Sequence, residues 1–243
     1  MPNIGIVSQA RMTSSRLPGK VLLTANGITV LEYHLKRLAW SNIPVYVATT
    51  VNDSDQPITS LTQLLGIPHY CGDEHNVLQR FYECAVHFKL DVIIRVTSDC
   101  PLIDGYLVAE GSHQYQKLKD KNAYYSNVLL RTYPRGLDFE IFSFELLRMA
   151  YLNANENQDK EHVTPYIHQN KSKTVAIHNF TSTEDHSDLR WTLDTVDDWK
   201  LIKTLLEKYH VAHLRYAEIL NIVQQHPELV LINNHIKQKG IRL

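Results

Sequence analysis

The sequence predicts an α/β fold with helices on both faces of a mostly parallel sheet. Three observations support this prediction. Over the first hundred residues, short β-branched apolar runs alternate with amphipathic stretches, which is typical of strands joined by crossover helices. The chain has 243 residues, 44% of them hydrophobic, which is enough for a sizeable core. No repeat, low-complexity tract or linker divides it. We therefore expect a single domain spanning residues 1–243.

The first half of the chain gives the clearest elements. Apolar runs predict strands at residues 3–8, 44–49, 67–71 and 91–96. The helical period of the intervening segments predicts helices at residues 30–38, 53–65 and 76–88. Right-handed crossovers place the carboxyl ends of parallel strands at one edge of the sheet, where ligands bind. We therefore give most weight to the segments that follow the strands, at residues 9–20, 50–55, 72–80 and 97–104.

The pattern changes after about Ala123. Strands are predicted at residues 137–142, 175–180 and 189–193. Helices are predicted after the first of these strands and at residues 197–209 and 217–225. We interpret residues 127–188 as an insertion that leaves the main sheet and returns to it near Trp191.

Composition and charge exclude several classes of protein. Lys and Arg total 25 against 26 for Asp and Glu, so the net charge of −1 provides no global field for nucleic acid or an anionic membrane. No stretch approaches the roughly 20 apolar residues of a membrane span, and the N-terminal residues contain no apolar signal-peptide core. Three cysteines without metal-ligand spacing fit a reducing compartment. We expect a cytoplasmic protein that binds neither nucleic acid nor membrane.

A basic loop follows the first predicted strand. Residues 11–20 have the sequence RMTSSRLPGK and include Arg11, Arg16 and Lys20. The backbone N–H groups of a strand-to-helix loop can face an anion, and the three cations add charge-assisted hydrogen bonds to phosphate oxygens. The alternative is a solvated surface loop. The position of the basic loop and its RLPGK run favour phosphate binding, although the GxxxxGK[ST] and GxGxxG motifs are absent.

Two aspartates follow predicted strands at the same edge. Asp99 comes after the fourth strand, and Asp194 comes after the strand predicted at residues 189–193. Carboxylates there can hold Mg²⁺, which prefers oxygen ligands and bridges substrate phosphates. The alternative for each is to cap the following helix, since Asp is favoured at that position. Spacing alone supports the two roles of Asp99 equally, and for Asp194 it favours the cap.

Four segments, in order, resemble the cytidylyltransferases that make CMP-activated sugar acids. GIVSQAR to RLPGK at residues 5–20 resembles their signature loop. GDEHNVLQRF at 72–81, RVTSDCPLID at 95–104 and LDTVDD at 193–198 resemble the SpsF-type subgroup, which is similar to 3-deoxy-manno-octulosonate cytidylyltransferase. Four ordered motifs are more specific than any one of them. The resemblance implies a Rossmann-like sheet of the nucleotide-diphospho-sugar transferase type, with a small inserted lid or dimerisation subdomain.

The resemblance also implies roles for individual residues. Asp99 becomes the primary ligand of Mg²⁺ and Asp194 the second, while Arg11, Lys20 and Asp99 become the catalytic residues. The CTP-binding residues that it implies are Gln9, Ala10, Arg11, Ser15, Arg16, Lys20, Asn76, Arg80, Thr97 and Ser98. The acceptor-binding residues that it implies are Arg135, Asp138, Glu140, Glu161 and His162. Relatives are commonly homodimers joined through the insertion, so a homodimer is implied as well.

Simpler interpretations of some of these residues stay open. Arg80 could pair with Glu74 or Glu83 on a surface helix. Arg135 could be an exposed turn residue, and His162 could be a packed or surface histidine.

Two departures from the family pattern affect the substrate contacts. Thr97-Ser98 stands where the octulosonate enzymes have a Gln-Gly pair, so contacts to the base or ribose differ. Lys160 departs from the family run REHVTPYI.

The leading hypothesis for the activity is transfer of CMP from CTP to a small anionic acceptor, with release of pyrophosphate. The acceptor would be a sugar acid, a phosphate or a phosphonate. A glycosyltransferase is the second hypothesis, and Asp53-Ser54-Asp55 supplies the DxD string that such enzymes use. A non-catalytic nucleotide-sugar-binding protein is the third, although Lys20 and Asp99 are both present. The sequence does not identify the acceptor.

Overall fold

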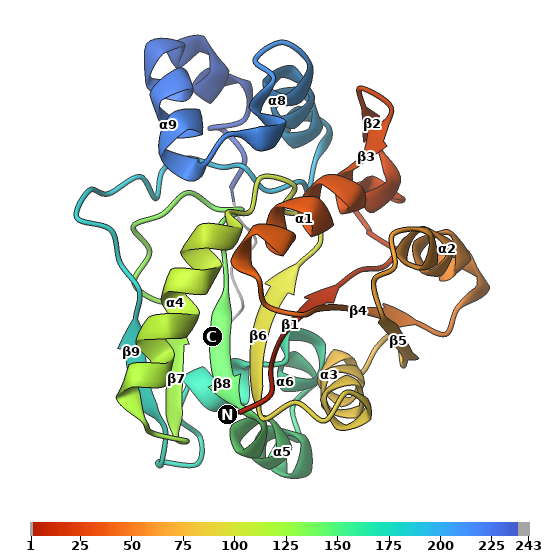
Figure 1. Cartoon of the computed structure of the whole chain (residues 1–243), viewed down its shortest axis with the longest axis vertical. Coiled ribbons are helices and arrows are strands. Elements are labelled where there is room, and N and C mark those ends of the chain that lie inside the picture. Colours follow the sequence, from red (N-terminus) through yellow and green to blue (C-terminus); the bar gives the residue numbers. More distant parts are fainter. Residues whose placement is uncertain (1, 238–243) are drawn as a thin grey trace.

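A seven-stranded sheet in the order β5-β4-β1-β6-β8-β7-β9 forms the centre of the structure (Figure 1). The computed structural model describes residues 2–237. Only β8 runs antiparallel to its neighbours, because β1 pairs in parallel with β4 and β6, β4 with β5, and β7 with β9. The mostly parallel α/β fold is therefore confirmed.

The helices and strands have the following bounds. The strands are β1 (Ile4–Gln9), β2 (Thr24–Ala25), β3 (Ile28–Thr29), β4 (Val45–Thr50), β5 (His69–Gly72), β6 (Val92–Thr97), β7 (Ala123–Ser126), β8 (Glu140–Ser143) and β9 (Ala176–Asn179). The α-helices are α1 (Val30–Leu38), α2 (Gln56–Leu64), α3 (Val77–His87), α4 (Gly105–Leu118), α5 (Phe144–Asn153), α6 (Asn157–His162), α7 (Pro165–His168), α8 (Val196–Glu207) and α9 (Tyr216–Gln225).

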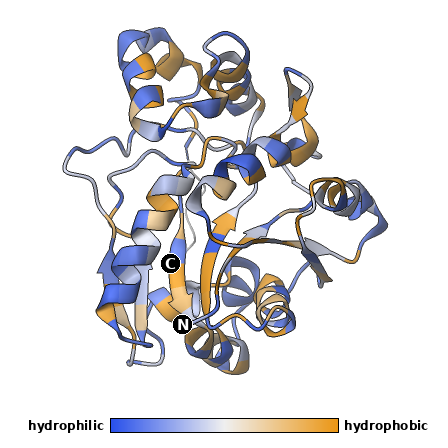
Figure 2. Ribbon diagram, viewed as in Figure 1, coloured by the Kyte–Doolittle hydropathy of each residue, from blue (hydrophilic) through white to orange (hydrophobic). Residues whose placement is uncertain are grey.

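Alternation along the strands builds one core on each face of the sheet. Neighbouring residues of a strand point to opposite faces, so Ile93 packs in a core with α3 and α5, whereas Ile94 packs in a core with α1, α4 and α8. The central strands β6 and β8 are coloured as hydrophobic in Figure 2, while the helices carry hydrophilic outer faces. Burial on both faces explains why the β6 segment is a continuous apolar run with few polar residues.

The strands and helices predicted in the first half of the chain are present with ends shifted by one or two residues, apart from a short 3-10 helix at Asp53–Asp55 that precedes α2. None of the helices within residues 2–237 has the length and apolarity that a membrane crossing requires. The β2–β3 hairpin was not predicted, because its two-residue strands are too short to produce a periodic pattern.

The strand predicted at residues 189–193 is wrong. This segment makes one isolated parallel bridge, between Arg135 and Arg190. Its backbone bonds to loops, since Trp191 N donates to the carbonyl of Arg135 (2.6 Å) and Leu193 N donates to that of Asp99 (2.8 Å). Gly136 makes the close approach possible, because a Cβ there would lie 2.6 Å from the carbonyl carbon of Trp191. The apolar pattern of residues 189–193 therefore reflects burial between two loops.

Residues 127–188 do not leave the sheet as expected. β8 and β9 come from this range, and β8 lies beside β6 near the centre of the sheet. The residues of β8 are buried on both faces, since Phe142 packs in a core with α5 and α7 and Ile141 packs in a core with α4. The range is thus part of the main sheet, and its expected roles in acceptor binding and dimerisation stay predictions.

Candidate active site

The basic loop is held at the carboxyl edge of the sheet by a buried carboxylate. Asp55 is 1% exposed, and its Oδ1 accepts a hydrogen bond from the backbone N–H of Met12 (2.8 Å). Its Oδ2 accepts from Thr50 Oγ1 (2.6 Å) at the end of β4. Asp55 is therefore committed to anchoring the basic loop. The Asp53–Asp55 string accordingly acts as a structural element, which removes the support it gave to a glycosyltransferase.

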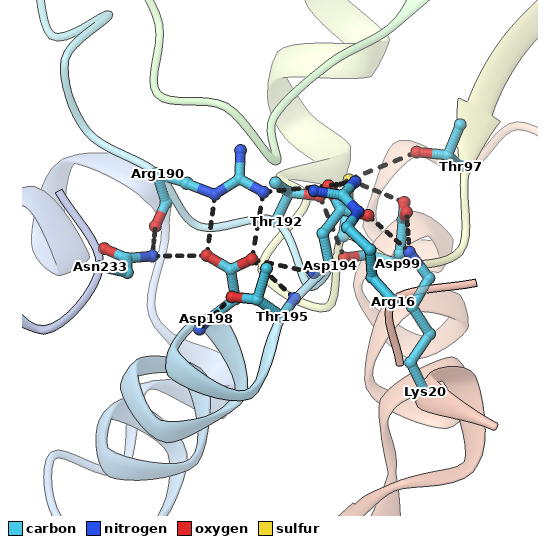
Figure 3. A network of polar contacts seen from close by, with 11 residues as sticks. Arg16, Lys20, Thr97, Asp99, Arg190, Thr192, Asp194, Thr195, Asp198 and Asn233 are labelled. Atoms are coloured by element: carbon cyan, nitrogen blue, oxygen red, sulfur yellow. Dashed lines mark hydrogen bonds and ion pairs between the residues drawn. The ribbon is translucent and has the colours of Figure 1, made fainter. Parts of the chain in front are cut away.

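Lys20, Asp99 and Asp194 meet at this edge, although they are far apart in the sequence. Lys20 ends the basic loop, Asp99 follows β6 and Asp194 precedes α8. The Lys20 Nζ atom lies 2.6 Å from Asp99 Oδ2 and 2.8 Å from Asp194 Oδ1 (Figure 3). One ammonium group thus bridges both carboxylates, and the three side chains that the sequence singled out for phosphate and metal binding form one cluster.

The charges in this cluster stabilise one another. Burial would raise the pKa of Asp99, but the charge of Lys20 and its hydrogen bond outweigh burial and bring that pKa down to about 2. Burial would lower the pKa of Lys20, but the charges of Asp99 and Asp194 outweigh it and raise that pKa above its usual value. The ammonium group is therefore protonated and the Asp99 carboxylate ionised at neutral pH. Removing one partner would leave a partly buried charge without its counter-ion.

The carboxylate of Asp194 also forms ion pairs with two arginines. Its Oδ2 lies 2.9 Å from Arg16 Nη2 and 2.9 Å from Arg190 Nη2. Arg16 comes from the basic loop, so it was predicted. Arg190 was not predicted. Its signal in the sequence is a charged residue inside the apolar run 189–193, since a buried guanidinium needs carboxylate or carbonyl partners.

A pocket of about 280 Å³ opens at this edge of the sheet. Twelve residues with predicted roles line it, and together they form its polar wall. They are Gln9, Ala10, Arg11, Ser15, Arg16, Lys20, Arg80, Thr97, Asp99, Glu161, His162 and Asp194. Ser14, Val21 and Val77 complete the lining. The pocket therefore joins the loops after β1 and β6 with α3, α6 and Asp194, which lies two residues before α8.

Two predicted CTP-binding residues do not line this pocket. Ser98 is 1% exposed, and its Oγ lies 2.7 Å from Ser8 Oγ in the interior. The side chain of Ser98 therefore ties β6 to β1, and its predicted contact with CTP stays a prediction. Asn76 caps α3, where its side chain accepts a hydrogen bond from Gln79 N (3.1 Å). It lines a neighbouring polar pocket of about 490 Å³ that shares Arg11 and Glu161 with the first one.

Three predicted acceptor-binding residues also lie outside the pocket. Glu140 is buried and accepts hydrogen bonds from Tyr124 Oη (2.5 Å), Thr164 Oγ1 (2.6 Å) and Arg95. Arg95 Nη2 also donates to Gln9 Oε1 (3.0 Å), so Glu140 is connected through Arg95 to a residue that lines the pocket, without lining it itself. Its predicted contact with the acceptor stays a prediction.

Asp138 and Arg135 lie on the other side of the cluster. Both oxygens of Asp138 are taken by Arg131, at 2.6 and 2.9 Å. Arg135 lines a small cavity of about 60 Å³ together with Arg190 and Asn233. Burial and the nearby charge of Arg131 lower the pKa of Arg135. Their predicted contact with the acceptor stays a prediction.

Arg80 is a donor that faces the pocket from the first turns of α3. The residue is 1% exposed, and its Nη1 donates to the carbonyl of Asp73 (2.6 Å). Burial is the main cause that lowers its pKa, to about 10. Its Nε is buried and makes no hydrogen bond within residues 2–237. An unpaired buried donor is costly, so Arg80 is suited to a ligand that brings an acceptor.

Asp99 and Asp194 have the chemistry that a magnesium site needs. A single cationic group already lies within 2.8 Å of both, so the two carboxylates are spaced to share one positive charge. Mg²⁺ is commonly held by one or two carboxylates, with waters and substrate phosphates as the other ligands. No group of three or more His, Cys, Asp or Glu side chains suited to a metal occurs among residues 2–237. The residues present therefore fit a metal that arrives with a phosphate-bearing substrate.

The charges around the pocket suit a substrate with several phosphates, since Arg11, Arg16 and Lys20 come from one loop and the carboxylates of Asp99 and Asp194 lie beside them. On this edge of a mostly parallel sheet, such an arrangement defines a nucleotidyltransferase. Residues 4–236 match the cytidylyltransferase family, and the chain belongs to that family.

Individual relatives agree with this assignment. The chain is 34% identical over its whole length to an uncharacterized protein of Methanocaldococcus jannaschii, covering 98% of that protein. It is 29% identical to the spore coat polysaccharide biosynthesis protein SpsF of Bacillus subtilis, over 94% of this chain and 97% of SpsF. A cytidylyltransferase structure from Leptospira borgpetersenii has a TM-score of 0.91 at 27% identity, covering 99% of this chain and 100% of that one. The resemblance to the SpsF-type subgroup is thus confirmed.

A more distant structure shares the fold. The structure of CMP:2-keto-3-deoxy-manno-octonic acid synthetase complexed with CTP has a TM-score of 0.60 at 17% identity, covering 84% of this chain and 98% of that one.

Proposed function

We propose that the protein transfers CMP from CTP to a small anionic acceptor in a Mg²⁺-dependent reaction that releases pyrophosphate. The observation that carries this proposal is the Lys20 ammonium group between Asp99 and Asp194, in a pocket also lined by Arg11 and Arg16. Cations for the phosphates and carboxylates for a metal are the parts that phosphoryl transfer uses. The CTP complex of the distant fold relative supports the choice of nucleotide.

The reaction needs no covalent intermediate on the protein. An acceptor oxygen attacks the α-phosphorus, the bond to the α,β-bridging oxygen breaks, and pyrophosphate leaves with that electron pair. Arg11, Arg16 and Lys20 would hold the β- and γ-phosphates and stabilise the charge on the leaving pyrophosphate. Asp99 and Asp194 would hold Mg²⁺, which neutralises phosphate charge when it is bound. Because Lys20 occupies both carboxylates in this structure, its ammonium group must release them as metal and nucleotide bind.

Arg80 is proposed to read the base. A guanidinium group has donors only, and the N3 position of cytosine accepts a hydrogen bond whereas the N3–H of uracil donates one. A buried Arg80 Nε that faces an N3 acceptor would therefore favour cytosine over uracil.

The acceptor is proposed to approach from the α6 side, where Glu161 and His162 line the pocket. Burial lowers the pKa of His162, so its imidazole is neutral at pH 7 and suited to hydrogen bonding with a polar acceptor. The similarity to SpsF supports a place in polysaccharide biosynthesis. A homodimer and a cytoplasmic location stay predictions, and light scattering tests the first.

The proposed function is tested by pyrophosphate release. Each of CTP, UTP, ATP and GTP is incubated with Mg²⁺ and a panel of sugar acids, sugar phosphates and phosphonates, and products are identified by mass spectrometry. We expect a CMP-conjugate with one class of acceptor and no product from Asp99→Asn. Asp53→Asn is the matched control, because Asp53 is an aspartate outside the pocket, and it should retain activity. Turnover with UTP in place of CTP, or full activity in Asp99→Asn, would contradict the proposal.

A further inference from the structure

Asp198 is a wholly buried carboxylate in the first turn of α8, outside the pocket. Its Oδ1 accepts hydrogen bonds from Arg190 Nε (2.8 Å) and Asn233 Nδ2 (2.9 Å). Its Oδ2 accepts from the backbone N–H groups of Asp194 (3.0 Å) and Thr195 (2.9 Å) and from Arg190 Nη2 (3.1 Å) (Figure 3). The buried charge is thus fully hydrogen-bonded, as its desolvation requires.

Arg190 connects this buried carboxylate to the one in the pocket. The same nitrogen, Nη2, lies 2.9 Å from Asp194 Oδ2 and 3.1 Å from Asp198 Oδ2. Asp194 is therefore held twice, at its backbone N–H by Asp198 and at its carboxylate by Arg190. Neither Arg190 nor Asp198 lines the pocket. Two of the groups that orient Asp194 thus lie where a ligand in the pocket does not touch them, while Arg16 and Lys20 contact its carboxylate from the pocket.

Asn233 closes the network from the far end of the chain. It follows the 3-10 helix Pro227–Ile232 and is 2% exposed. Its Nδ2 donates to Asp198 Oδ1 and to the backbone carbonyl of Arg190, both at 2.9 Å. Both N–H bonds of the amide are used, and an aspartate or a leucine at this position would supply neither.

We propose that Asn233, Asp198 and Arg190 form a positioning unit that sets the carboxylate of Asp194 for the metal. This inference rests on the proposed function, in which Asp194 is a ligand of Mg²⁺. It makes the segment after α9 part of the active site, although none of its residues up to Lys237 lines the pocket. Outer partners that orient a ligand commonly change metal affinity about 10- to 100-fold when they are removed.

A purely structural role for Asp198 would need fewer partners. Thr195 caps α8, and the Asp198 carboxylate accepts a hydrogen bond from the Thr195 N–H, which completes a capping box. That motif requires neither Arg190 nor Asn233. Arg190 and Asn233 donate three additional hydrogen bonds to Asp198. These bonds fix Arg190 and Asp198, which both contact Asp194, and we therefore assign the three residues a role in positioning.

The test compares two buried asparagines. Asn233→Leu removes both donors at similar volume. Asn127→Leu is the matched control, because Asn127 is also buried and bridges two segments, accepting from Phe139 N (2.9 Å) and donating to the carbonyl of Leu137 (2.7 Å), without lining the pocket. Mn²⁺ serves as the probe, and its binding is measured by the electron paramagnetic resonance signal of free Mn²⁺ with a CTP analogue whose α,β bond cannot be cleaved. Melting temperatures are measured in parallel.

We expect both variants to melt at lower temperature, and only Asn233→Leu to bind Mn²⁺ about tenfold or more weakly. Equal Mn²⁺ affinity in wild type and Asn233→Leu would overturn the positioning role alone. A wild type that binds no Mn²⁺ with the nucleotide would overturn the proposed function and the inference with it. If Asn233→Leu does not fold, Arg190→Lys takes its place, because a lysine keeps the charge but cannot bridge Asp194 and Asp198 as the guanidinium does. Unchanged Mn²⁺ affinity in Arg190→Lys would then overturn the inference.

Discussion

The part of the site that follows β1, β5 and β6 and the part at residues 190–198 hold their charged groups in different ways. In the first part, the loops follow hydrogen-bonded parallel strands, and their side chains reach the pocket directly. In the second part no strand is present, and Asp194 is held through Arg190, Asp198 and Asn233. The first part is therefore positioned by the backbone of the sheet together with the buried Asp55, whereas the second part has no strand and depends on side chains from separate segments.

The largest expected effect tests whether both parts serve one metal. Asp99→Asn should keep the shape of the side chain but remove its charge, and kcat should fall by at least about 100-fold, since loss of a charge-stabilising group costs a few kcal/mol. Asp194→Asn should reduce kcat in the same direction but less severely, because Arg16 and Arg190 still fix its position. Steady-state kinetics across Mg²⁺ concentrations measure both. A normal kcat in either variant, with the fold intact by circular dichroism, would remove that aspartate from the metal site.

A buried histidine beneath the first part makes stability depend on pH. His34 Nε2 lies 2.8 Å from Ser8 Oγ, which continues to Ser98 Oγ, and His34 Nδ1 lies 2.9 Å from the carbonyl of Cys100. Burial is the main cause that lowers the pKa of His34 to about 4. An unfolded histidine binds its proton near pH 6.5, whereas folded His34 binds its proton only near pH 4. The free energy of unfolding is therefore fully retained above pH 6.5 and decreases as the pH falls from 6.5 toward 4. The loss amounts to about 3 kcal/mol.

Denaturant unfolding between pH 4 and pH 7 measures this effect. His34→Gln cannot take up the proton, so its free energy of unfolding should be lower at pH 7 but should decline less on acidification than that of the wild type. His162 and His168 have lowered pKa values as well, so only the difference between wild type and variant isolates His34. Parallel pH profiles of the two proteins would show that His34 does not titrate in this range.

The first part of the site could be predicted because its information is local. The alternation of apolar runs with helical stretches located the strands, and the residues that follow parallel strands had to meet at one edge of the sheet. The second part could not be predicted in the same way. Asn233 lies in a polar segment without periodicity, and its partners Asp198 and Arg190 are 35 and 43 residues away. The alternating pattern around Glu140 indicated a strand, but no pattern revealed that Arg95 would pair with Glu140 beneath the pocket.

A third prediction separates the two functions of Lys20. Lys20→Ala should weaken CTP binding about tenfold or more, because a charge-assisted contact is worth about 1.5–3 kcal/mol. The same change should strengthen binding of Mn²⁺ in the absence of nucleotide, since Asp99 and Asp194 lose the ammonium group that neutralises them. Arg11→Ala is the control, because Arg11 contacts neither carboxylate and should weaken CTP binding only. Calorimetry measures both ligands, and weaker binding of Mn²⁺ alone by Lys20→Ala would contradict the exchange of ammonium for metal.

The smallest expected effect concerns the outer anchor of the basic loop. Glu74 accepts hydrogen bonds from Thr13 Oγ1 and from Asn52 Nδ2 (2.6 Å), and its Oε1 lies 3.9 Å from Arg11 Nη1. Contacts this close to solvent contribute about 0.2–1 kcal/mol, and Asp55 still anchors the loop from the interior. Glu74→Gln should therefore change the KM for CTP less than about threefold.

The small effect expected of Glu74→Gln is informative when it is compared with the larger effect expected of Asn233→Leu. Glu74 contacts two residues of the basic loop directly, whereas Asn233 is connected to the pocket only through other side chains. We nevertheless expect replacement of Glu74 to have the smaller effect on substrate or metal binding. The backbone of β1 and the buried Asp55 already position the basic loop, so Glu74 is redundant, whereas Asp194 lies outside any strand and its carboxylate is positioned by side chains. A tenfold rise in KM for Glu74→Gln, measured by pyrophosphate release at saturating acceptor, would show that the basic loop also depends on side chains at its surface. The proposed difference between the two parts of the site would then be wrong.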